Sequence, residues 1–359
     1  MNRFKDGFSF PKNRRENTMK TKKAFIYAGS IVLSILVMGI LLFKFYEYKA
    51  FKTIKTSSFS VSNKINRRKP ISVLLLGVDT GSDGRIDRGL SDSMMITTLN
   101  PQTKQTLIYS IPRDSLAEIK TNGTKKDVQK INAAYEIGKA PIAKKTVSAF
   151  LGVPLDYSVT IDMGALKDLV DFVGGVTVKT DIDVSFDGQT ISKGTHHLNG
   201  KEALAYTRMR YQDPRGDYGR QLRQQEVLMQ IVHKLQAPQY MLRIPSLMNK
   251  LGSHISTDLT TQQIEKLIKH YHQCTKHVVT KQLIGREAWI NGSSYQVIAT
   301  SNLQMASNQL RKALGLTSKK LNNTETGLNA LNKDYFSDPN STMYDTAGLD
   351  TTYYTDNTY

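Results

Sequence analysis

Residues 24–43 form an uninterrupted apolar run, AFIYAGSIVLSILVMGILLF, that contains no charged side chain. A helix of this length spans roughly 30 Å, the thickness of the hydrocarbon core of a bilayer. The run exceeds the ~7–15 apolar residues of a typical signal peptide, and no small-residue cleavage motif follows it. The alternatives are a buried soluble helix and a cleaved signal peptide. The sequence favours one uncleaved transmembrane helix ahead of the rest of the chain.

Basic residues flank this run on both sides. Residues 1–23 carry eight Lys or Arg and two acids, and residues 44–69 carry eight Lys or Arg and one acid. Because both flanks are basic, the positive-inside rule alone hardly decides the orientation. A short N-terminus ahead of a large domain usually stays inside, so we expect residues 1–23 in the cytoplasm and residues 44–359 outside. Anionic headgroups of the lipid bilayer are the natural partner of both flanks.

The remaining composition indicates a folded domain followed by a tail. The chain has a net charge of +18, with 39% hydrophobic and 22% charged residues. Cys274 is its one cysteine, which excludes an internal disulfide framework and a cysteine-clustered metal site. Residues 334–359 contain five acids, no Lys or Arg and no apolar periodicity. We therefore expect a basic linker over 44–69 and a disordered acidic tail over 334–359.

Residues 70–333 alternate between strand-like and helix-like patterns, which predicts an α/β domain with a mixed central β-sheet flanked by helices. Residues 71–78, ISVLLLGV, read as a buried strand. Residues 94–99 and 106–111 flank the turn-rich NPQTK and predict a hairpin. Further strands are predicted at 157–161, 176–184 and 278–299, and helices at 133–151 with a break at Pro141, 163–172, 199–206, 219–235, 260–271 and 302–314.

Two carboxylates lie near the ends of predicted strands. Asp79 follows the strand at 71–78, and Asp92 lies in GLSDSMM just ahead of the next strand. Ligands collect at strand ends in α/β sheets, and Mg²⁺ prefers one or two carboxylates with water and substrate phosphates. The pair therefore predicts a magnesium site, although Asp79 could instead cap a turn in DTGSDG.

Basic side chains recur in three later motifs. Arg113 stands beside Asp114 in IPRD, and Lys130 stands in KINAAY; a surface salt bridge and a solvated base are the alternatives for them. The segment YTRMRYQDPRGDYGRQLRQQ holds the densest group: Arg208, Arg210, Arg215, Arg220 and Arg223. Arg208 and Arg210 would share a face in an extended segment, and Arg220 and Gln224 would share a face of the next helix. Arginine suits a bidentate grip on phosphate, although a solvated basic helix face is the alternative.

Taken together, these motifs resemble the LytR-CpsA-Psr family of cell-wall ligases. The resemblance covers roughly residues 70–235. It runs in order through LLLGVD, SDSMMITTLNPQTKQ, SIPRD, KINAAY, DFVGGV, LNGKEALAYTRMR and DYGRQLRQQ. It implies that residues 70–235 form a catalytic domain outside the membrane, with residues 236–333 as an α/β extension of unassigned role.

The resemblance also implies an activity: transfer of teichoic acid, capsule or another wall polysaccharide from an undecaprenyl-pyrophosphate carrier to peptidoglycan, with Mg²⁺. It assigns Asp79 and Asp92 to the metal, and these two with Arg113 and Arg220 to catalysis. The implied pyrophosphate-binding residues are Arg113, Lys130, Arg208, Arg210, Arg220 and Gln224. The sequence departs from the family at Leu90, where an Arg is common, and Arg85 or Arg88 could supply that charge.

Two other function classes compete with this reading. A membrane-bound transcriptional regulator would fit a basic chain, but no helix-turn-helix signature is present, so we expect no nucleic-acid partner. A non-catalytic wall-polymer binding protein would have no need of the two metal carboxylates. His270, His272, Cys274 and His277 also lie close together in sequence, and a partly exposed helix end is the simpler reading of that group than a metal site.

Overall fold

The computed structural model describes residues 64–78, 89–234, 240, 251 and 254–350. The predicted transmembrane helix over 24–43, most of the predicted linker over 44–69 and residues 351–359 lie outside the described residues. Among the helices that are described, none has both the length and the apolar character needed to cross a bilayer. The last linker residues belong to the fold, because Ile65 is fully buried in a core cluster.

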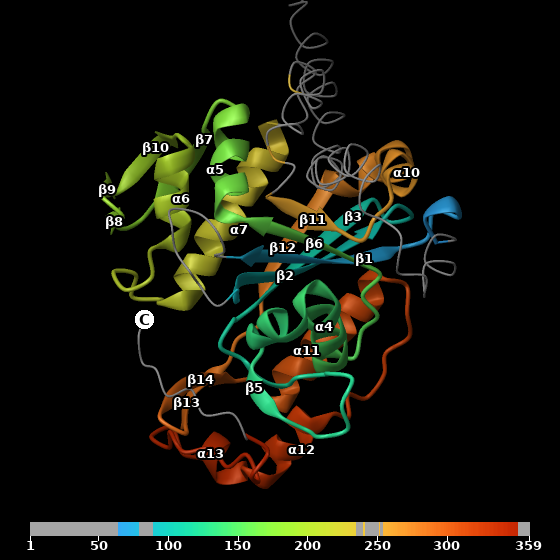
Figure 1. The fold of residues 1–359 in the computed structure, drawn as a ribbon, viewed down its shortest axis with the longest axis vertical. Helices are drawn as coiled ribbons and strands as arrows, with labels where there is room; N and C mark the ends of the chain where they lie inside the picture. Colours follow the sequence, from blue (N-terminus) through green and yellow to red (C-terminus); the bar gives the residue numbers. More distant parts are fainter. Residues whose placement is uncertain (1–63, 79–88, 235–239, 241–250, 252–253, 351–359) are drawn as a thin grey trace, which may run out of the picture.

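A mixed β-sheet forms the centre of the described part of the chain (Figure 1). Its strand order is β11-β6-β1-β2-β3-β12. β1 pairs antiparallel with β2 and parallel with β6, β2 pairs antiparallel with β3, and β3 pairs parallel with β12. The strands are β1 (Ile71–Val78), β2 (Ser91–Asn100), β3 (Gln105–Ile111), β6 (Tyr157–Asp162), β11 (Ile255–Thr257) and β12 (His277–Gln282). The predicted mixed sheet and its hairpin are confirmed.

Helices cover both faces of this sheet (Figure 1). Val73 of β1 packs into the core under one helical layer, whereas Leu74 and Leu76 pack into the core under the other. Because both faces are covered, β1 is a nearly continuous apolar run rather than an alternating one. One layer holds α5 (Met163–Phe172), α6 (Gly200–Arg208), α7 (Asp217–Lys234) and α10 (Thr261–Tyr271); the other holds α4 (Ala133–Leu151) and α11 (Thr300–Ala313).

Most predicted helices are found within one or two residues of their expected ends, and α5 has the bounds predicted for it. α6 begins after a capping box in which Asn199 accepts from the backbone of Glu202 while Glu202 accepts from Asn199. The break in α4 is at Gly138 and Lys139 rather than at Pro141 itself. A proline ring clashes with the helical turn that precedes it, so the distortion lies upstream of Pro141.

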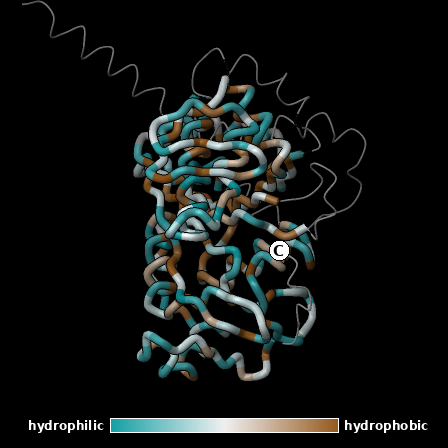
Figure 2. Tube along the Cα trace, turned by 90° about the vertical axis from the view of Figure 1, so that its left-hand side faces the viewer, coloured by the Kyte–Doolittle hydropathy of each residue, from teal (hydrophilic) through white to brown (hydrophobic). Residues whose placement is uncertain are grey.

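Four two-stranded sheets accompany the central sheet among the described residues. They pair β4 (Leu116–Glu118) with β5 (Val128–Lys130), β7 (Val176–Thr180) with β10 (Gly194–Leu198), β8 (Val184–Phe186) with β9 (Gln189–Ile191), and β13 (Arg286–Ile290) with β14 (Ser293–Val297). In Figure 2, apolar residues recur at short intervals along the coloured part of the trace. This is the pattern expected when each element has one buried face.

The residues after 235 do not form a separate unit. β11 and β12 come from this region, and each pairs with a strand of the central sheet. The division predicted at residue 235 therefore runs through one folded body rather than between two.

The prediction of disorder over 334–359 is wrong for residues 334–350. A third core packs Tyr335 and Tyr344 against the β13–β14 hairpin and α12 (Thr324–Leu331), with α13 (Lys333–Ser337) beside them. Tyr335 and Tyr344 meet edge to face, with ring centroids 5.2 Å apart. These two tyrosines supply the buried apolar surface of the segment. A search for apolar periodicity overlooks them, because they are isolated aromatic residues among acidic ones.

Candidate active site

Asp92 stands on a β-bulge inside β2, rather than ahead of the strand as predicted. The register pairs Gly77 with Ser93 and Val78 with Ser91, so Asp92 has no partner on β1. A bulge of this kind bends its strand and re-aims the extra side chain. Here it directs Asp92 toward Arg113 and toward a cavity between the sheet and the helices.

Arg113 and Asp114 lie in a turn directly after β3. The Ser115 hydroxyl donates to the Pro112 carbonyl at 2.7 Å and closes this turn. The backbone N–H of Asn132 donates to the Arg113 carbonyl at 3.2 Å. β4 then pairs with β5, with Leu116 opposite Lys130. The IPRD and KINAAY motifs, separated in sequence, are therefore neighbours in space.

Charged side chains form a continuous set of contacts at this point. Arg113 Nη1 lies 2.5 Å from Asp92 Oδ1, and Arg113 Nε lies 3.6 Å from Asp114 Oδ2. Lys130 Nζ lies 3.3 Å from Asp114 Oδ1. Burial opposes the charge on Arg113, but the nearby carboxylates of Asp92 and Asp114 outweigh it and raise the pKa of the guanidinium. Arg113 is therefore a fixed cation that holds Asp92 in place.

Arg220 completes this set from the first turn of α7. Its Nη2 donates to the Asp92 carbonyl at 3.1 Å. The same atom lies 2.6 Å from Asp217 Oδ1, a close ion pair without hydrogen-bond alignment, and Arg220 Nε has no hydrogen-bond partner among the described residues. Burial lowers the pKa of Arg220. Repulsion from Arg113 lowers it further, whereas attraction to Asp217 acts in the opposite direction. Its charge is therefore incompletely balanced, as expected of a cation that receives an anionic ligand.

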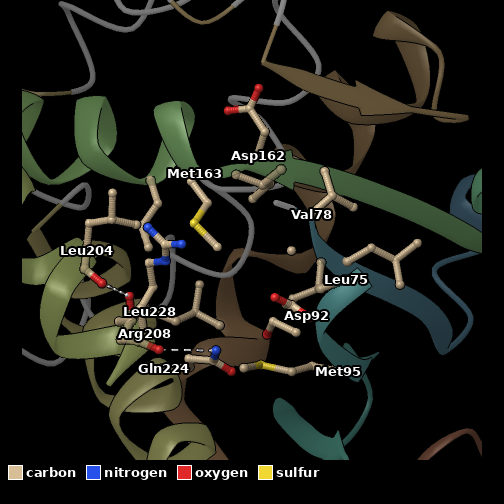
Figure 3. A pocket seen from close by; sticks show the side chains of 16 residues that line it. Leu75, Val78, Asp92, Met95, Asp162, Met163, Leu204, Arg208, Gln224 and Leu228 are labelled. Atoms are coloured by element: carbon tan, nitrogen blue, oxygen red, sulfur yellow. Dashed lines mark hydrogen bonds between the residues drawn. The ribbon is translucent and has the colours of Figure 1, made fainter. Parts of the chain in front are cut away.

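An apolar cavity of about 130 Å³ adjoins Asp92. Figure 3 shows Arg208 and Gln224 reaching into it from α6 and α7 and Asp92 lying opposite, with Met163, Leu228 and Met95 among them. The Arg208 guanidinium lies 5.2 Å from the ring centre of Phe186, and Gln224 donates to the Thr207 carbonyl at 3.4 Å. The apolar lining is Leu75, Leu76, Gly77, Val78, Met95, Ile161, Met163, Leu166, Leu204 and Leu228. We call this space the apolar cavity.

A second and larger cavity, of about 550 Å³, lies between the α6–α7 loop and the β13–β14 hairpin. We call it the polar cavity. Arg210 stacks on Tyr211 at 4.4 Å and lines it. Its full lining is Asp114, Lys130, Arg210, Tyr211, Asp213, Pro214, Gly216, Asp217, Glu287, Trp289, Gly292, Ser293, Ser294 and Gln296.

The two buried arginines connect these cavities. Arg113 contacts Asp92 of the apolar cavity and Asp114 of the polar cavity. Arg220 likewise contacts the backbone of Asp92 and the carboxylate of Asp217. The same pair of guanidinium groups therefore contacts carboxylate residues that line both cavities.

The structure distributes the predicted site residues between these two spaces. Asp92, Arg208 and Gln224 line the apolar cavity, Lys130 and Arg210 line the polar cavity, and Arg113 and Arg220 lie between them. Arg208 and Arg210 do not share a face as expected of an extended segment, because α6 continues through Arg208 and Arg210 lies beyond its end.

Some of the predicted residues remain without a described position. Asp79, Arg85 and Arg88 lie outside the described residues, and Leu90 precedes β2 directly. The predicted pairing of Asp79 with Asp92 therefore stays a prediction.

Other arginines of the motif brace the loop. Arg223 is buried, pairs with Asp213, and donates from Nε to the Tyr206 carbonyl at 2.9 Å. A Cβ at Gly219 would lie 1.9 Å from Asp213 Oδ2, so only glycine allows Asp213 to enter. Arg215 also pairs with Asp213, at 2.9 Å. These contacts hold the loop between α6 and α7 that carries Arg210 and Tyr211.

Residues far beyond the recognised motifs also position the site. The Tyr218 hydroxyl donates to Gln296 Oε1 at 2.9 Å and accepts from the Gly285 backbone at 2.7 Å. The Gln296 backbone N–H donates to the Asp114 carbonyl at 2.8 Å. Gln282 donates to the Tyr218 carbonyl at 2.9 Å. Sequence reasoning missed Gln282 and Gln296, because isolated glutamines outside the recognised motifs carry no signal, and it did not single out Tyr218 within DYGRQLRQQ.

The histidine and cysteine group forms no metal site in the described part of the chain, where no group of three or more His, Cys, Asp or Glu side chains could hold an ion. Cys274 is fully buried beside α10, in the 3₁₀ helix at His272–Lys276, and burial raises the pKa of its thiol to about 12. Cys274 is therefore a core residue.

Comparison with known proteins decides the family. The model of the LytR_cpsA_psr family matches residues 43–312. The chain belongs to the LytR-CpsA-Psr family. The match extends past residue 235, so the family's fold includes β11, β12 and the β13–β14 hairpin as well as the motifs recognised in the sequence.

Individual relatives cover most of the chain. It is 36% identical over 302 residues to the polyisoprenyl-teichoic acid–peptidoglycan teichoic acid transferase TagU of Enterococcus faecalis, covering 82% of this chain and 98% of that one. It is 36% identical over 350 residues to biofilm regulatory protein A of Streptococcus mutans, covering 91% and 84%. The solved structure of TagT bound to LIIa-WTA is 28% identical, has a TM-score of 0.58 and covers 73% of this chain and 95% of that one.

Proposed function

We propose that this chain is a glycopolymer–peptidoglycan phosphotransferase, which moves a polymer from an undecaprenyl-pyrophosphate carrier to peptidoglycan. The observation that carries the proposal is the junction at Asp92. The Asp92 carboxylate, on a β-bulge, faces an apolar cavity and pairs with the largely buried Arg113, while the buried Arg220 donates to the backbone carbonyl of Asp92. An apolar chain ending in a diphosphate matches this combination of a dry cavity and cations. TagU carries teichoic acid in its name and teichoic acid is therefore the first donor polymer to test, with capsule polysaccharide as the alternative.

The lipid and the diphosphate have separate places in this scheme. The polyprenyl chain enters the apolar cavity along Met163 and Leu228. Arg208 at the cavity, together with Arg113 and Arg220 beside it, offsets the charge of the diphosphate. Phosphoryl transfer depends mainly on positioning and on neutralising charge, so a set of fixed cations is the main contribution required from the protein.

The bond changes follow from that placement. A sugar hydroxyl of peptidoglycan attacks the phosphorus that carries the polymer and forms a new P–O bond. The bond from that phosphorus to the bridging oxygen breaks, and polyprenyl phosphate leaves with that oxygen. The hydroxyl proton passes to a carboxylate, for which Asp92 is placed at the cavity and Asp79 is the predicted companion.

A magnesium ion fits the donor chemistry of Asp92 in part. Its carboxylate is a hard oxygen ligand at the cavity, with one oxygen engaged by Arg113. Asp92 lacks two further acid, His or Cys neighbours among the described residues, so Mg²⁺ would need Asp79 or the substrate phosphates to complete its shell. When bound, the ion would supply charge neutralisation at the transferring phosphorus.

We further propose that the chain is a single-pass membrane protein with its N-terminus in the cytoplasm and residues 64–350 outside. The apolar run at 24–43 and its basic flanks support this arrangement. Digestion of intact protoplasts with protease tests it. Loss of residues 64–350 is expected, and protection of that region would refute the topology.

Reconstituted transfer tests the activity. Purified chain is mixed with a polyprenyl-pyrophosphate-linked teichoic acid, peptidoglycan oligosaccharides and Mg²⁺, and polymer-bearing peptidoglycan and released polyprenyl phosphate are measured. Asp92→Ala and Arg220→Ala are expected to lower the rate by about 10²-fold or more.

Asp181→Ala is the matched control for these variants. Its carboxylate is 70% exposed and lines neither cavity. This variant should keep the wild-type rate. Wild-type rates in folded Asp92→Ala and Arg220→Ala proteins would refute the proposed site.

A further inference from the structure

We propose that the polar cavity binds the acceptor, a peptidoglycan glycan strand, and that Trp289 is a platform on which a sugar ring packs. This inference deepens the proposed function and rests on it. Its starting point is position: Asp114 and Asp217 of the polar cavity pair with Arg113 and Arg220, and the same two arginines contact Asp92 of the apolar cavity. An acceptor held in the polar cavity would therefore lie one layer of side chains away from the diphosphate.

The lining of the polar cavity suits a sugar better than an anionic polymer. Its carboxylates come from Asp114, Asp213, Asp217 and Glu287, of which the first three pair with arginines, and its cations are Lys130 and Arg210. A polyphosphate chain would find these two cations already engaged by Asp114 and Tyr211, whereas sugar hydroxyls can donate to carboxylate oxygens. Its volume of about 550 Å³ is of the size that holds small ligands, roughly 300–1,000 Å³.

Two exposed aromatic side chains stand on opposite sides of this cavity. Trp289 of β13 is 49% exposed, and Tyr211 of the α6–α7 loop is 80% exposed. An exposed aromatic ring beside polar groups offers an apolar face that the C–H face of a sugar ring can cover. Tyr211 is the more exposed of the two rings, but the Arg210 guanidinium already stacks on it, so a sugar ring would compete with that guanidinium there.

Trp289 is held firmly in this position. The neighbouring Ala288 and Ile290 are buried, so strand alternation turns Trp289 and Glu287 together toward the outer side. Asn291 and Gly292 form the hairpin turn with φ of 49° and 77°, the pattern of a tight two-residue loop. A preorganised platform loses little conformational entropy when a ligand binds.

Residues 338–343 contact β13 and so support the position of Trp289. The Trp289 backbone N–H donates to the Thr342 carbonyl at 2.8 Å, and Trp289 forms a β-bridge with Met343. Arg286 donates to the Ser341 carbonyl and to the Asp338 carbonyl, the latter at 2.7 Å. These residues lie past 312, where the family match ends. The wall of the polar cavity is therefore supported by a part of the chain that lies beyond the match to the family model.

Trp289 is also the one tryptophan of the chain, so its fluorescence reports on this cavity alone. The full chain in detergent is titrated with soluble, uncross-linked peptidoglycan glycan fragments, without lipid donor or Mg²⁺. A saturable change in Trp289 emission is expected. The titration is repeated with Tyr211→Ala, which keeps the reporter, and calorimetry measures binding by Trp289→Ala. Both variants should bind the fragments roughly threefold to tenfold more weakly.

Met305→Ala is the matched control, because Met305 is 50% exposed on α11 and lines neither cavity. It should bind like the wild type. Equal affinity in wild type and Trp289→Ala, no response to the glycan fragments, or a response to poly(glycerol phosphate) instead would overturn the proposal. Since the binding assay needs no donor, a chain that binds the fragments but transfers nothing would refute the proposed activity and leave this site standing.

Discussion

Arg220 and Arg223 lie one turn apart on α7, and the structure predicts opposite consequences when each is replaced by methionine. Arg223 is buried, pairs with the fully buried carboxylate of Asp213, and donates to two backbone carbonyls. Arg223→Met would leave two backbone acceptors unpaired and the buried Asp213 with Arg215 as its remaining cation, at a cost of about 3–5 kcal/mol in unfolding free energy.

Arg220 has a less favourable environment in the folded chain. Burial lowers the pKa of its guanidinium, so the fold disfavours its charge rather than stabilising it. Arg220→Met would leave Asp217 without its arginine, but the Asp217 carboxylate still accepts a hydrogen bond from Gln221 at 2.9 Å. We therefore expect Arg220→Met to cost only about 1–2 kcal/mol in unfolding free energy, while the transfer rate falls about 10²–10³-fold.

Chemical denaturation and reconstituted transfer measure the two effects. Met305→Ala is the control, because Met305 is 50% exposed on α11 and lines neither cavity. Its transfer rate should stay within threefold of wild type. The reasoning fails if Arg220→Met destabilises as strongly as Arg223→Met, or if Arg220→Met transfers polymer at a rate within threefold of wild type.

Three further predictions concern single side chains. Asp92→Asn removes the charge opposite Arg113 and should slow transfer about 10²-fold with an unchanged fold by circular dichroism; an unaffected rate would exclude Asp92 from the chemistry. Burial raises the pKa of Glu325 to about 7. Because the folded chain then retains a proton that the unfolded chain loses above pH about 4.5, unfolding free energy should fall as pH rises from about 4.5 to 7, by up to about 3 kcal/mol. Glu325→Gln should flatten that profile in denaturation series, and an unchanged slope would contradict this. The Cys274 thiol should resist a thiol reagent at pH 8 until denaturant is added, and rapid labelling of the folded chain would disprove its burial.

Much of the fold could be predicted from the sequence, because the signals for these elements come from residues close together in the chain. β1 is a continuous apolar run because helices cover both sheet faces, and the 163–172 helix ends before Gly174 and Gly175, which adopt positive φ. These signals lie within a few residues of the elements that they define. For that reason, the bounds of α5 and the hairpin of β2 and β3 were predictable.

The features that the sequence did not predict depend on contacts between residues far apart in the chain. No local pattern indicates the bulge that isolates Asp92, because it depends on the register of β2 against β1. The order in residues 334–350 depends on tyrosines meeting a hairpin some fifty residues earlier in the chain. The assignment of Lys130 and Arg210 to one cavity and Arg208 to another likewise depends on where α6 ends.

The late strands also set the order in which this molecule can be completed. β12 pairs with β3 across more than 160 residues of chain, and the Val128 backbone N–H donates to the carbonyl of Leu349. A chain emerging N-terminus first therefore exposes the open edge of β3 until β12 has appeared, and the Val128 backbone waits longer still for Leu349. Contacts this distant in sequence slow folding, and an unpaired edge invites association with other chains. Newly made copies thus pass through a vulnerable interval that lasts until residues 277–282 have been made.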